Sequence, residues 1–229
     1  MPNRTLMKAV KILRIVATII FLLALFFVPA GTLNWPEAWI FIVFYLATIC
    51  GLVIWMKKKN PGLLKERQRK KPDAKPWDKI LMRVYTGVLG IMVIIIGLDA
   101  VRFGWTRVPV VLRVIGFLGL LPASAILFWA LKENSYLSDM VVIQADRGHR
   151  VCTTGPYRYV RHPYYVGVIF FFLLIPLALG SFYGLIPGLA ISLLFVARTS
   201  LEDRTLRREL PGYQDYAQKV RYRLLPGIW

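Results

Sequence analysis

The 229-residue chain is 57% hydrophobic with a mean hydropathy of +0.54, above the roughly 45–50% apolar content of soluble domains. Its 30 basic and 12 acidic residues give a formal charge of +18. Most basic residues flank apolar blocks or lie in one connector, so basic loops beside anionic lipid explain the charge better than a nucleic-acid partner. Two cysteines and two histidines argue against a disulfide framework and give no metal-ligand pattern. This composition predicts an integral protein of the cell or inner membrane.

Apolar runs of nearly membrane-crossing length predict an all-α, polytopic transmembrane fold with about six spans. The first four spans are expected at residues 15–33, 38–56, 80–101 and 110–131. The first is expected to be a retained anchor, because no cleavage site of the small-x-small type follows it. Near the end of the third span, Asp99 is expected to be an end-of-helix group that reaches the membrane interface.

The last apolar run covers residues 164–197 and is interrupted by Pro176, Gly180 and Gly184, which are expected to break it. Two arms of about 15–17 residues would each reach about 25 Å, short of a hydrocarbon core of about 30 Å. We therefore expect a tight helical hairpin with slightly short arms.

Basic residues are distributed unequally between the two sides that six spans would define. The amino terminus, the connector 57–79, the segment 132–163 and the tail from Arg198 carry 26 of them, against three on the other side. By the positive-inside rule, both termini and the segment 132–163 are expected in the cytosol. The connector is expected to be a loop, either a solvated one that fixes topology or a lid or lipid-binding element. The chain divides into transmembrane helices with this basic loop at 1–131 and a catalytic region at 132–229.

A motif from Gly155 to Gly167 reads Gly-Pro-Tyr-Arg-Tyr-Val-Arg-His-Pro-Tyr-Tyr-Val-Gly, directly before the hairpin. Its two prolines push the preceding residues out of helical geometry, which predicts an irregular loop with free backbone donors and acceptors. Such a loop can hold a small polar ligand at the membrane face; an aromatic and basic interfacial belt is the alternative. Arg158 and Arg161 are open between anchoring lipid phosphate and a structural role.

The hairpin returns the chain to the side it left, so this motif and the start of the tail are expected to meet. Arg198 and Glu202 are four residues apart and share one face if the helix continues, with Asp203 turned elsewhere. The spacing alone favours an exposed ion pair between Arg198 and Glu202, together with an interface anchor.

The Gly155–Gly167 motif, with Gln144 and Gly148-His149 before it and Glu202-Asp203 after the hairpin, resembles the isoprenylcysteine carboxyl methyltransferase family. The resemblance covers roughly residue 134 to the carboxyl end, which reads Arg-Leu-Leu-Pro-Gly-Ile-Trp. It implies a helical membrane enzyme that uses S-adenosylmethionine without a Rossmann domain. The sequence agrees, because no strand is followed by a Gly-x-Gly-x-x-Gly turn.

The resemblance implies that Arg198 holds the carboxylate of the substrate and that Glu202 contacts the cofactor. It implies further cofactor contacts from Gln144, His149, Arg150, Val151, Cys152, Tyr157, His162, Pro163, Tyr164 and Tyr165. A guanidinium recognises a carboxylate through two bonds and repels an amine, and an ionised carboxylate needs no general base. The expected function is S-adenosylmethionine-dependent O-methylation of a lipophilic acid, isoprenoid or prenylcysteine-like, that enters from the bilayer. Anionic lipid is expected at the basic cytosolic face, with no nucleic acid and no metal.

The sequence leaves three alternative functions open. The first is N-methylation of a phospholipid or a small amine. The second is a membrane reductase with a related helical core and a nicotinamide cofactor. The third is a basic membrane scaffold that binds anionic lipid and no cofactor at all.

Overall fold

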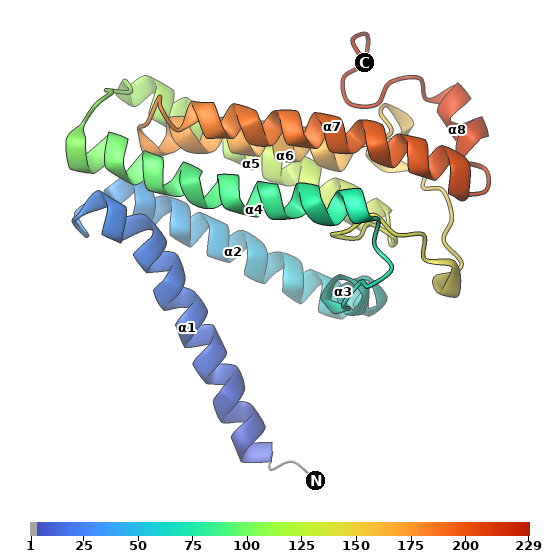
Figure 1. The fold of residues 1–229 in the computed structure, drawn as a ribbon, viewed down its shortest axis with the longest axis horizontal. Helices are drawn as coiled ribbons and strands as arrows, with labels where there is room; N and C mark the ends of the chain where they lie inside the picture. The colour runs from blue at the N-terminus through green and yellow to red at the C-terminus, as the bar shows by residue number, and fades with distance from the viewer. Residues whose placement is uncertain (1–3) are drawn as a thin grey trace.

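The computed structural model describes the backbone of residues 4–229, and the side chains of these residues other than 4–9, 11, 12 and 14. Within this part of the chain the regular structure is entirely helical, which confirms the expected all-α class. Helices α2 (Pro36–Lys59), α4 (Pro76–Gly97), α5 (Val110–Glu133), α6 (Pro163–Leu179) and α7 (Leu185–Glu209) run side by side, whereas α1 (Arg4–Ala30) leaves the bundle at an angle (Figure 1). The basic side chains expected at the amino terminus, Arg4, Lys8, Lys11 and Arg14, lie outside the described side chains.

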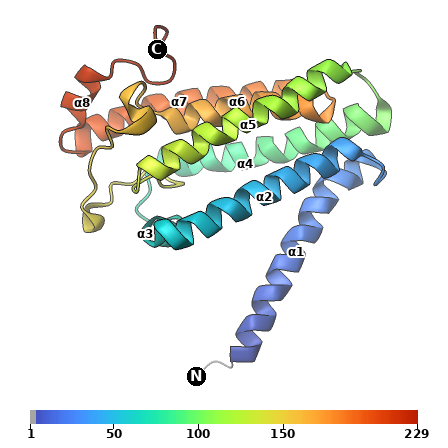
Figure 2. The same cartoon turned by 180° about the vertical axis from the view of Figure 1, so that it is seen from behind.

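The shorter elements are α3 (Pro61–Gln68), α8 (Tyr213–Lys219), a π-helix at Leu98–Phe103, and 3-10 turns at Ala145–Arg147 and Gly155–Arg158. Seen from behind, α3, α8 and the irregular segment before α6 gather at one end of the bundle (Figure 2). The segments that carry most of the basic residues therefore lie together, although they are far apart in the sequence.

Four helices are long and apolar enough to cross a membrane, namely α2, α4 with its π-helical extension, α5 and α7. The apolar part of α1 and all of α6 are shorter, at Ile15–Ala30 and Pro163–Leu179. The chain is thus an integral membrane protein whose helices occupy the six expected positions. The short first arm of the hairpin is confirmed, but the expected short second arm is wrong, because α7 continues beyond the apolar run and has 25 residues. The crossing of the membrane by all six stays a prediction.

The expected break at Pro176 is wrong, because α6 continues through this residue to Leu179. Proline is tolerated in membrane helices because neighbouring groups can satisfy the carbonyl that it leaves without a donor, which here is that of Phe172. A bond of 2.8 Å from the Ser181 nitrogen to the Pro176 carbonyl closes the end of the helix. The helix instead ends at Gly180, whose φ of +87° suits a residue without a Cβ atom. A tight turn then leads into α7.

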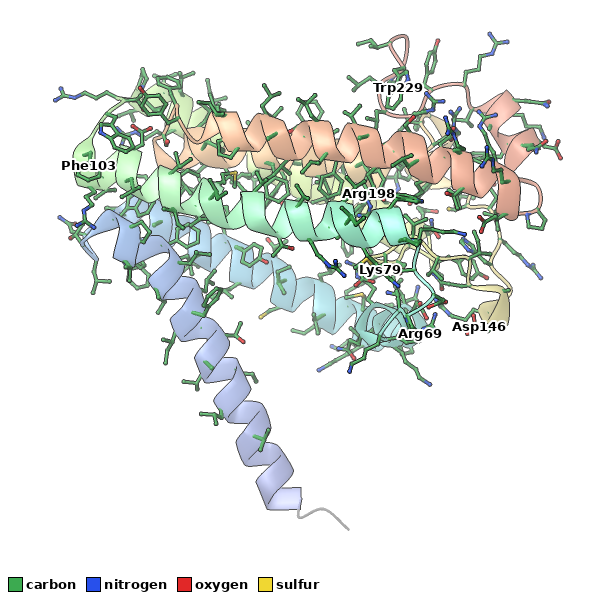
Figure 3. All side chains as sticks on the ribbon, viewed as in Figure 1. Arg69, Lys79, Phe103, Asp146, Arg198 and Trp229 are labelled. Atoms are coloured by element: carbon green, nitrogen blue, oxygen red, sulfur yellow. The ribbon has the colours of Figure 1, made fainter. Side chains whose placement is uncertain are left out.

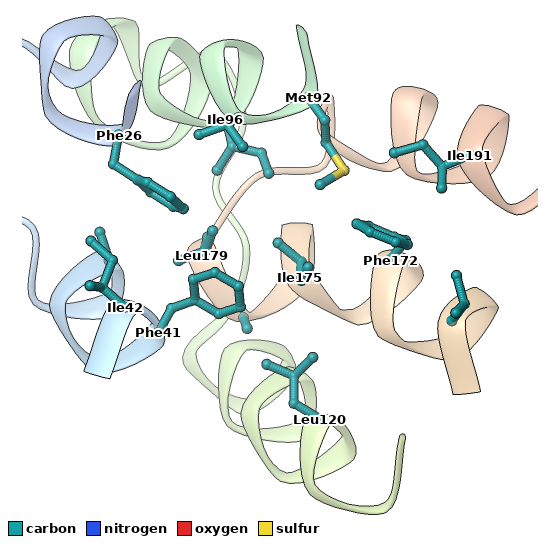
Figure 4. Packing of buried hydrophobic residues seen from close by; sticks show 14 of the residues in the cluster. Phe26, Phe41, Ile42, Met92, Ile96, Leu120, Phe172, Ile175, Leu179 and Ile191 are labelled. Atoms are coloured by element: carbon teal, nitrogen blue, oxygen red, sulfur yellow. The ribbon is translucent and has the colours of Figure 1, made fainter. Parts of the chain in front are cut away.

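Aromatic and aliphatic side chains from the long helices meet in one continuous core (Figure 4). It includes Phe26 of α1, Phe41 of α2, Ile96 of α4, Leu120 of α5 and Phe172 of α6. The helices α5 and α6 approach closely at Gly116, where a Cβ atom would lie 2.5 Å from the Ala178 nitrogen. Small residues at such crossings allow van der Waals packing between membrane helices.

Asp99 lies fully buried at the end of the bundle opposite α8, so its expected reach to the membrane interface is wrong. Its carboxylate accepts bonds from the Thr106 nitrogen at 2.7 Å, the Thr106 hydroxyl at 2.6 Å and the Ser181 hydroxyl at 2.6 Å. These donors compensate the buried charge and tie the turn after the π-helix to the hairpin turn. The expectation of an end-of-helix group is correct.

We expect Asp99→Ala to lower the free energy of unfolding by about 2–4 kcal/mol, since several buried donors lose their acceptor. Thermal unfolding in detergent measures this loss. Asp215→Ala removes an exposed acid and serves as the control. Equal melting temperatures of the two variants would show that the Asp99 bonds do not stabilise the fold.

The connector 57–79 is not the continuous loop expected from its composition. Helix α2 extends to Lys59, α3 covers eight residues, and α4 begins at Pro76. Proline at the first position starts both α3 and α4 because it has no backbone donor to leave unsatisfied. The Asn60 side chain caps α3 by accepting from the Leu63 nitrogen at 3.1 Å.

Candidate active site

A polar groove lies at the end of the bundle where the basic segments gather. Its free volume is about 720 Å³ including the open mouth, but only about 70 Å³ of it is wide enough for a water molecule. Ten of the twelve residues expected to bind the cofactor or substrate line it: His149, Arg150, Val151, Cys152, Tyr157, His162, Tyr164, Tyr165, Arg198 and Glu202. The other two, Gln144 and Pro163, are not among the lining residues. The roles of all twelve stay predictions.

The predicted meeting of the motif with the end of the hairpin is confirmed. The Tyr165 hydroxyl donates a hydrogen bond to Glu202, and the Arg198 guanidinium lies 5.4 Å from the centre of the Tyr165 ring. The His162 ring is parallel to that of Tyr165 with centroids 5.8 Å apart. Aromatic faces, a carboxylate and a guanidinium therefore converge at the deep wall of the groove.

Of the two roles left open for Arg161, anchoring of lipid phosphate and a structural role, the contacts of its side chain establish the structural one. Its Nη1 donates to the carbonyls of Val220 and Arg221, each at 2.7 Å. Its backbone nitrogen donates to the Tyr222 carbonyl at 3.0 Å. The motif and the carboxyl-terminal tail are therefore held together as one unit. Arg158, by contrast, is exposed.

Asp203 is the common partner of several basic side chains behind the groove. Its oxygens accept bonds from Arg161 Nε at 2.7 Å, Arg207 Nε at 3.0 Å and Arg223 Nε at 3.2 Å. The Tyr213 hydroxyl also donates to Asp203 at 2.9 Å and lies 3.3 Å from His162 Nε2. A buried carboxylate that accepts several charge-assisted bonds fixes the position of each donor.

Arg198 forms an ion pair with Asp78. The alternative interpretation from the sequence, an exposed ion pair between Arg198 and Glu202, is therefore wrong. Its Nε and Nη2 atoms donate to the two oxygens of Asp78 at 2.8 and 3.1 Å, and Nη2 also donates to the Asp139 carbonyl at 2.8 Å. Figure 3 shows the Arg198 side chain between α7 and α4, the helix that carries Asp78. Among the described residues no partner is found for Nη1, which leaves its two donors available to a ligand.

Gln144 does not line the groove but contacts His149, which does. It is fully buried, its amide donates to the Tyr136 carbonyl at 2.7 Å, and its backbone nitrogen donates to His149 Nδ1 at 3.4 Å. The His149 ring stacks on Tyr136 with centroids 4.7 Å apart. Burial, and then the nearby charge of Arg147, lower the pKa of His149 to about 4, so this ring is neutral at pH 7.

The low pKa of His149 predicts a pH-dependent stability. In the unfolded chain this histidine titrates near its ordinary pKa of 6.5, and in the folded chain near about 4. As pH falls between these values, the unfolded state takes up a proton that the folded state refuses, so the free energy of unfolding decreases. The loss is on the order of 1 kcal/mol, allowing for partial solvent exposure.

This decrease is measured as the difference in melting temperature between the wild type and His149→Gln at pH 7.5 and pH 4.5. The wild type should lose more of its stability than the variant over this range. A difference that does not change with pH would mean that His149 titrates alike in both states.

A second cavity, of about 660 Å³ and mainly apolar, lies between α2, α4, α5, α6 and α7. Its volume is within the range of about 300–1,000 Å³ typical of small-molecule sites. Aromatic side chains such as Tyr45, Phe128 and Phe172 line it at the level of the membrane helices. It shares four lining residues with the polar groove, namely Ser138, Tyr164, Tyr165 and Arg198. The two spaces therefore meet at these four residues.

Several residues of this site were not identified from the sequence. Asp78 lies in the basic connector 57–79, which was not assigned to the site from the sequence. Tyr213 and Tyr216 line the groove from α8, where nothing but their aromatic character signalled a role. Within residues 4–229 no group of three or more His, Cys, Asp or Glu residues is placed to hold a metal ion, as far as side chains are described.

The model of the isoprenylcysteine carboxyl methyltransferase (ICMT) family matches residues 114–208, which include the motif, the hairpin, Arg198 and Glu202. The chain is also similar to the nickel-cobalt-cadmium resistance protein NccN of Alcaligenes xylosoxydans xylosoxydans, with 28% identity over 158 residues. That match covers 63% of this chain and 66% of the relative, just under two thirds of its length. This match confirms the resemblance drawn from the sequence: residues 114–208 of this chain are similar to the isoprenylcysteine carboxyl methyltransferase family.

Proposed function

We propose that this chain is a membrane methyltransferase that uses S-adenosylmethionine and methylates the carboxylate of a lipophilic acceptor. The observation that supports this most is the shared wall of the polar groove and the apolar cavity, formed by Ser138, Tyr164, Tyr165 and Arg198. A water-soluble donor and a lipid-soluble acceptor can approach each other from the two sides of this wall. The family match to the same region points to the same chemistry.

The lining of the groove suits this cofactor chemically. Tyrosine faces and the Glu202 carboxylate favour a ligand with a positive charge, and the neutral His149 does not oppose one. When bound, the cofactor supplies a methyl group on a positively charged sulfur. The water-wide space of about 70 Å³ is smaller than the roughly 300 Å³ of small ligand sites, so we expect binding to widen the groove.

On the acceptor side, the residues position the substrate and need not move a proton, because a carboxylate is ionised at neutral pH. Asp78 occupies the edge of Arg198 that was expected to take the carboxylate through two bonds. The carboxylate of the acceptor can therefore bind only Nη1 of Arg198, a single nitrogen that carries two N–H donors. In this account the chain catalyses by orienting the carboxylate and excluding water.

We further propose that the groove faces the cytosol and that anionic lipid lies against this end of the bundle. The support is electrostatic: the basic segments gather here in space, and positive residues favour the cytosolic side. Modification of a cysteine placed in the tail by an impermeant reagent, in intact and in opened cells, tests the orientation. Labelling in intact cells would contradict it.

Glu202→Gln is expected to weaken binding of S-adenosylhomocysteine, the demethylated product, by about tenfold or more, because a charge-assisted hydrogen bond is lost. Calorimetry on the purified protein measures this affinity. Glu209→Gln is the control. Glu209 lies on the same helix, outside the groove, and accepts a bond from Lys75, so its replacement should leave the affinity unchanged. Equal affinities of wild type and Glu202→Gln would remove Glu202 from the cofactor site.

A second candidate function is N-methylation of an amine. Asp78 offsets the charge of Arg198, so Arg198 repels an amine less than expected from the sequence. Transfer of labelled methyl groups to a prenylated cysteine and to an aminophospholipid distinguishes the two. We expect transfer to the acid alone; transfer to the amine alone would establish the second candidate.

A further inference from the structure

We infer that Arg67 on α3 determines specificity at the acceptor site by attracting the acid group of the acceptor to the polar mouth of the apolar cavity. Arg67 lies outside the family-matched region. The inference rests on the proposed function, because it concerns the same acceptor, and it divides two tasks. Arg67 supplies the net positive charge, while Arg198 orients the carboxylate.

Arg67 is one of four polar or charged residues at one end of the apolar cavity, together with Ser138, Asp139 and Arg198. It is half-buried, and its Nη1 donates to the Leu137 carbonyl at 3.2 Å, which fixes the guanidinium beside the segment that carries Ser138 and Asp139. Helix α3 itself is anchored, because Leu63 is fully buried against Met56 and Leu131. The charge of Arg67 is therefore held in place at this cavity.

Near this mouth Arg198 is paired with Asp78, Lys71 with Asp139, and Arg69 with Glu66. Arg67 makes no ion pair with any residue whose side chain the structure describes. Of the two arginines that line the cavity, it is therefore the one without a carboxylate partner. An uncompensated cation in a site of reduced dielectric attracts an anion and repels an amine.

The cavity is thus apolar along its length and positively charged at one end. This matches an amphiphile whose hydrocarbon chain lies between the helices and whose ionised acid lies at the mouth. The charge on Arg67 restores a preference for an acid that Arg198, neutralised by Asp78, does not provide alone.

The test measures binding, not turnover, of two probes: an S-prenylated cysteine with an acetylated amine, and its carboxamide, which has the same chain and no charge. Calorimetry in detergent is carried out on the wild type, Arg67→Gln, Arg67→Lys and Lys65→Gln. Lys65 is exposed on the same helix outside the cavity and gives the same change of charge.

Arg67→Gln should bind the acid about tenfold more weakly and the carboxamide within twofold of the wild type. Arg67→Lys keeps the charge and should bind the acid within about threefold of the wild type, and Lys65→Gln should behave like the wild type. Equal losses for acid and carboxamide, or an Arg67→Lys as weak as Arg67→Gln, would overturn the inference, since the bond to Leu137 would then be what matters. A wild type that prefers the acid but does not methylate it would contradict the proposed function and leave this inference standing.

Discussion

Replacing Asp78 by alanine is expected to lower the free energy of unfolding by about 3–5 kcal/mol and to abolish methyl transfer. Asp78 is fully buried, and its carboxylate binds Arg198 through both oxygens and accepts from the Val141 nitrogen at 2.7 Å. Its removal leaves a buried guanidinium without a counter-charge and a buried backbone donor without an acceptor. Arg198 then loses the orientation in which Nη1 is left for the acceptor.

Chemical denaturation in detergent, combined with a methyl-transfer assay, measures both effects. Asp73→Ala is the matched control, because Asp73 lies in the same connector, is half exposed and pairs with Arg69 only at 3.7 Å; its loss should cost less than about 1 kcal/mol. The double variant Asp78→Leu with Arg198→Leu should be more stable than either single one, since no unpaired charge remains. If Asp78→Ala unfolds like the Asp73 control, the buried pair does not support the site.

Asp203→Ala is expected to have an effect of similar size on stability, about 3–5 kcal/mol, and to weaken binding of S-adenosylhomocysteine by at least tenfold. Three arginines and Tyr213 donate to this carboxylate, whose side chain is 1% exposed. Without it, Arg161 loses its counter-charge and the tail loses its bond through Arg223. The motif that lines the groove is then no longer held by the tail.

Melting temperature and ligand affinity are the two measurements for Asp203, and Asp203→Glu separates charge from shape. The glutamate keeps the charge, so it should recover part of both losses. Asp215→Ala, which removes an exposed acid from α8, should change neither. An Asp203→Ala protein with wild-type affinity would show that the groove is built without this network.

The positions of the six apolar helices were predictable because each depends on one local property, the length of an apolar run between basic or breaking residues. The meeting of Tyr165 with Glu202 was predictable because a hairpin must return the chain to its starting side. The residues of the groove followed from the resemblance of the Gly155–Gly167 motif to one family, and ten of the twelve line one groove.

The role of Asp78 was not predictable, because its partner Arg198 lies 120 positions later and neither residue's surroundings indicate the pairing. Arg198 with Glu202 satisfied a local helix rule, but the buried Asp78 from another helix took the guanidinium instead. Asp99 deviates for a related reason, because its buried charge is compensated by Ser181, 82 positions later, through a tertiary contact absent from any local pattern. Pro176 deviates because a proline within a membrane helix need not end it.

If a cytosolic donor site and a membrane acceptor site meet at Arg198, the product is a methyl ester, and the chemical nature of the product can be measured. Purified protein is incubated with tritium-labelled S-adenosylmethionine and the prenylated cysteine acid, and the lipid product is treated with alkali. A methyl ester releases its label as volatile methanol, whereas an N-methyl group keeps it. We expect complete release of the label from the wild-type product and no labelled product from Asp78→Ala. Label that stays with the lipid after alkali would contradict it.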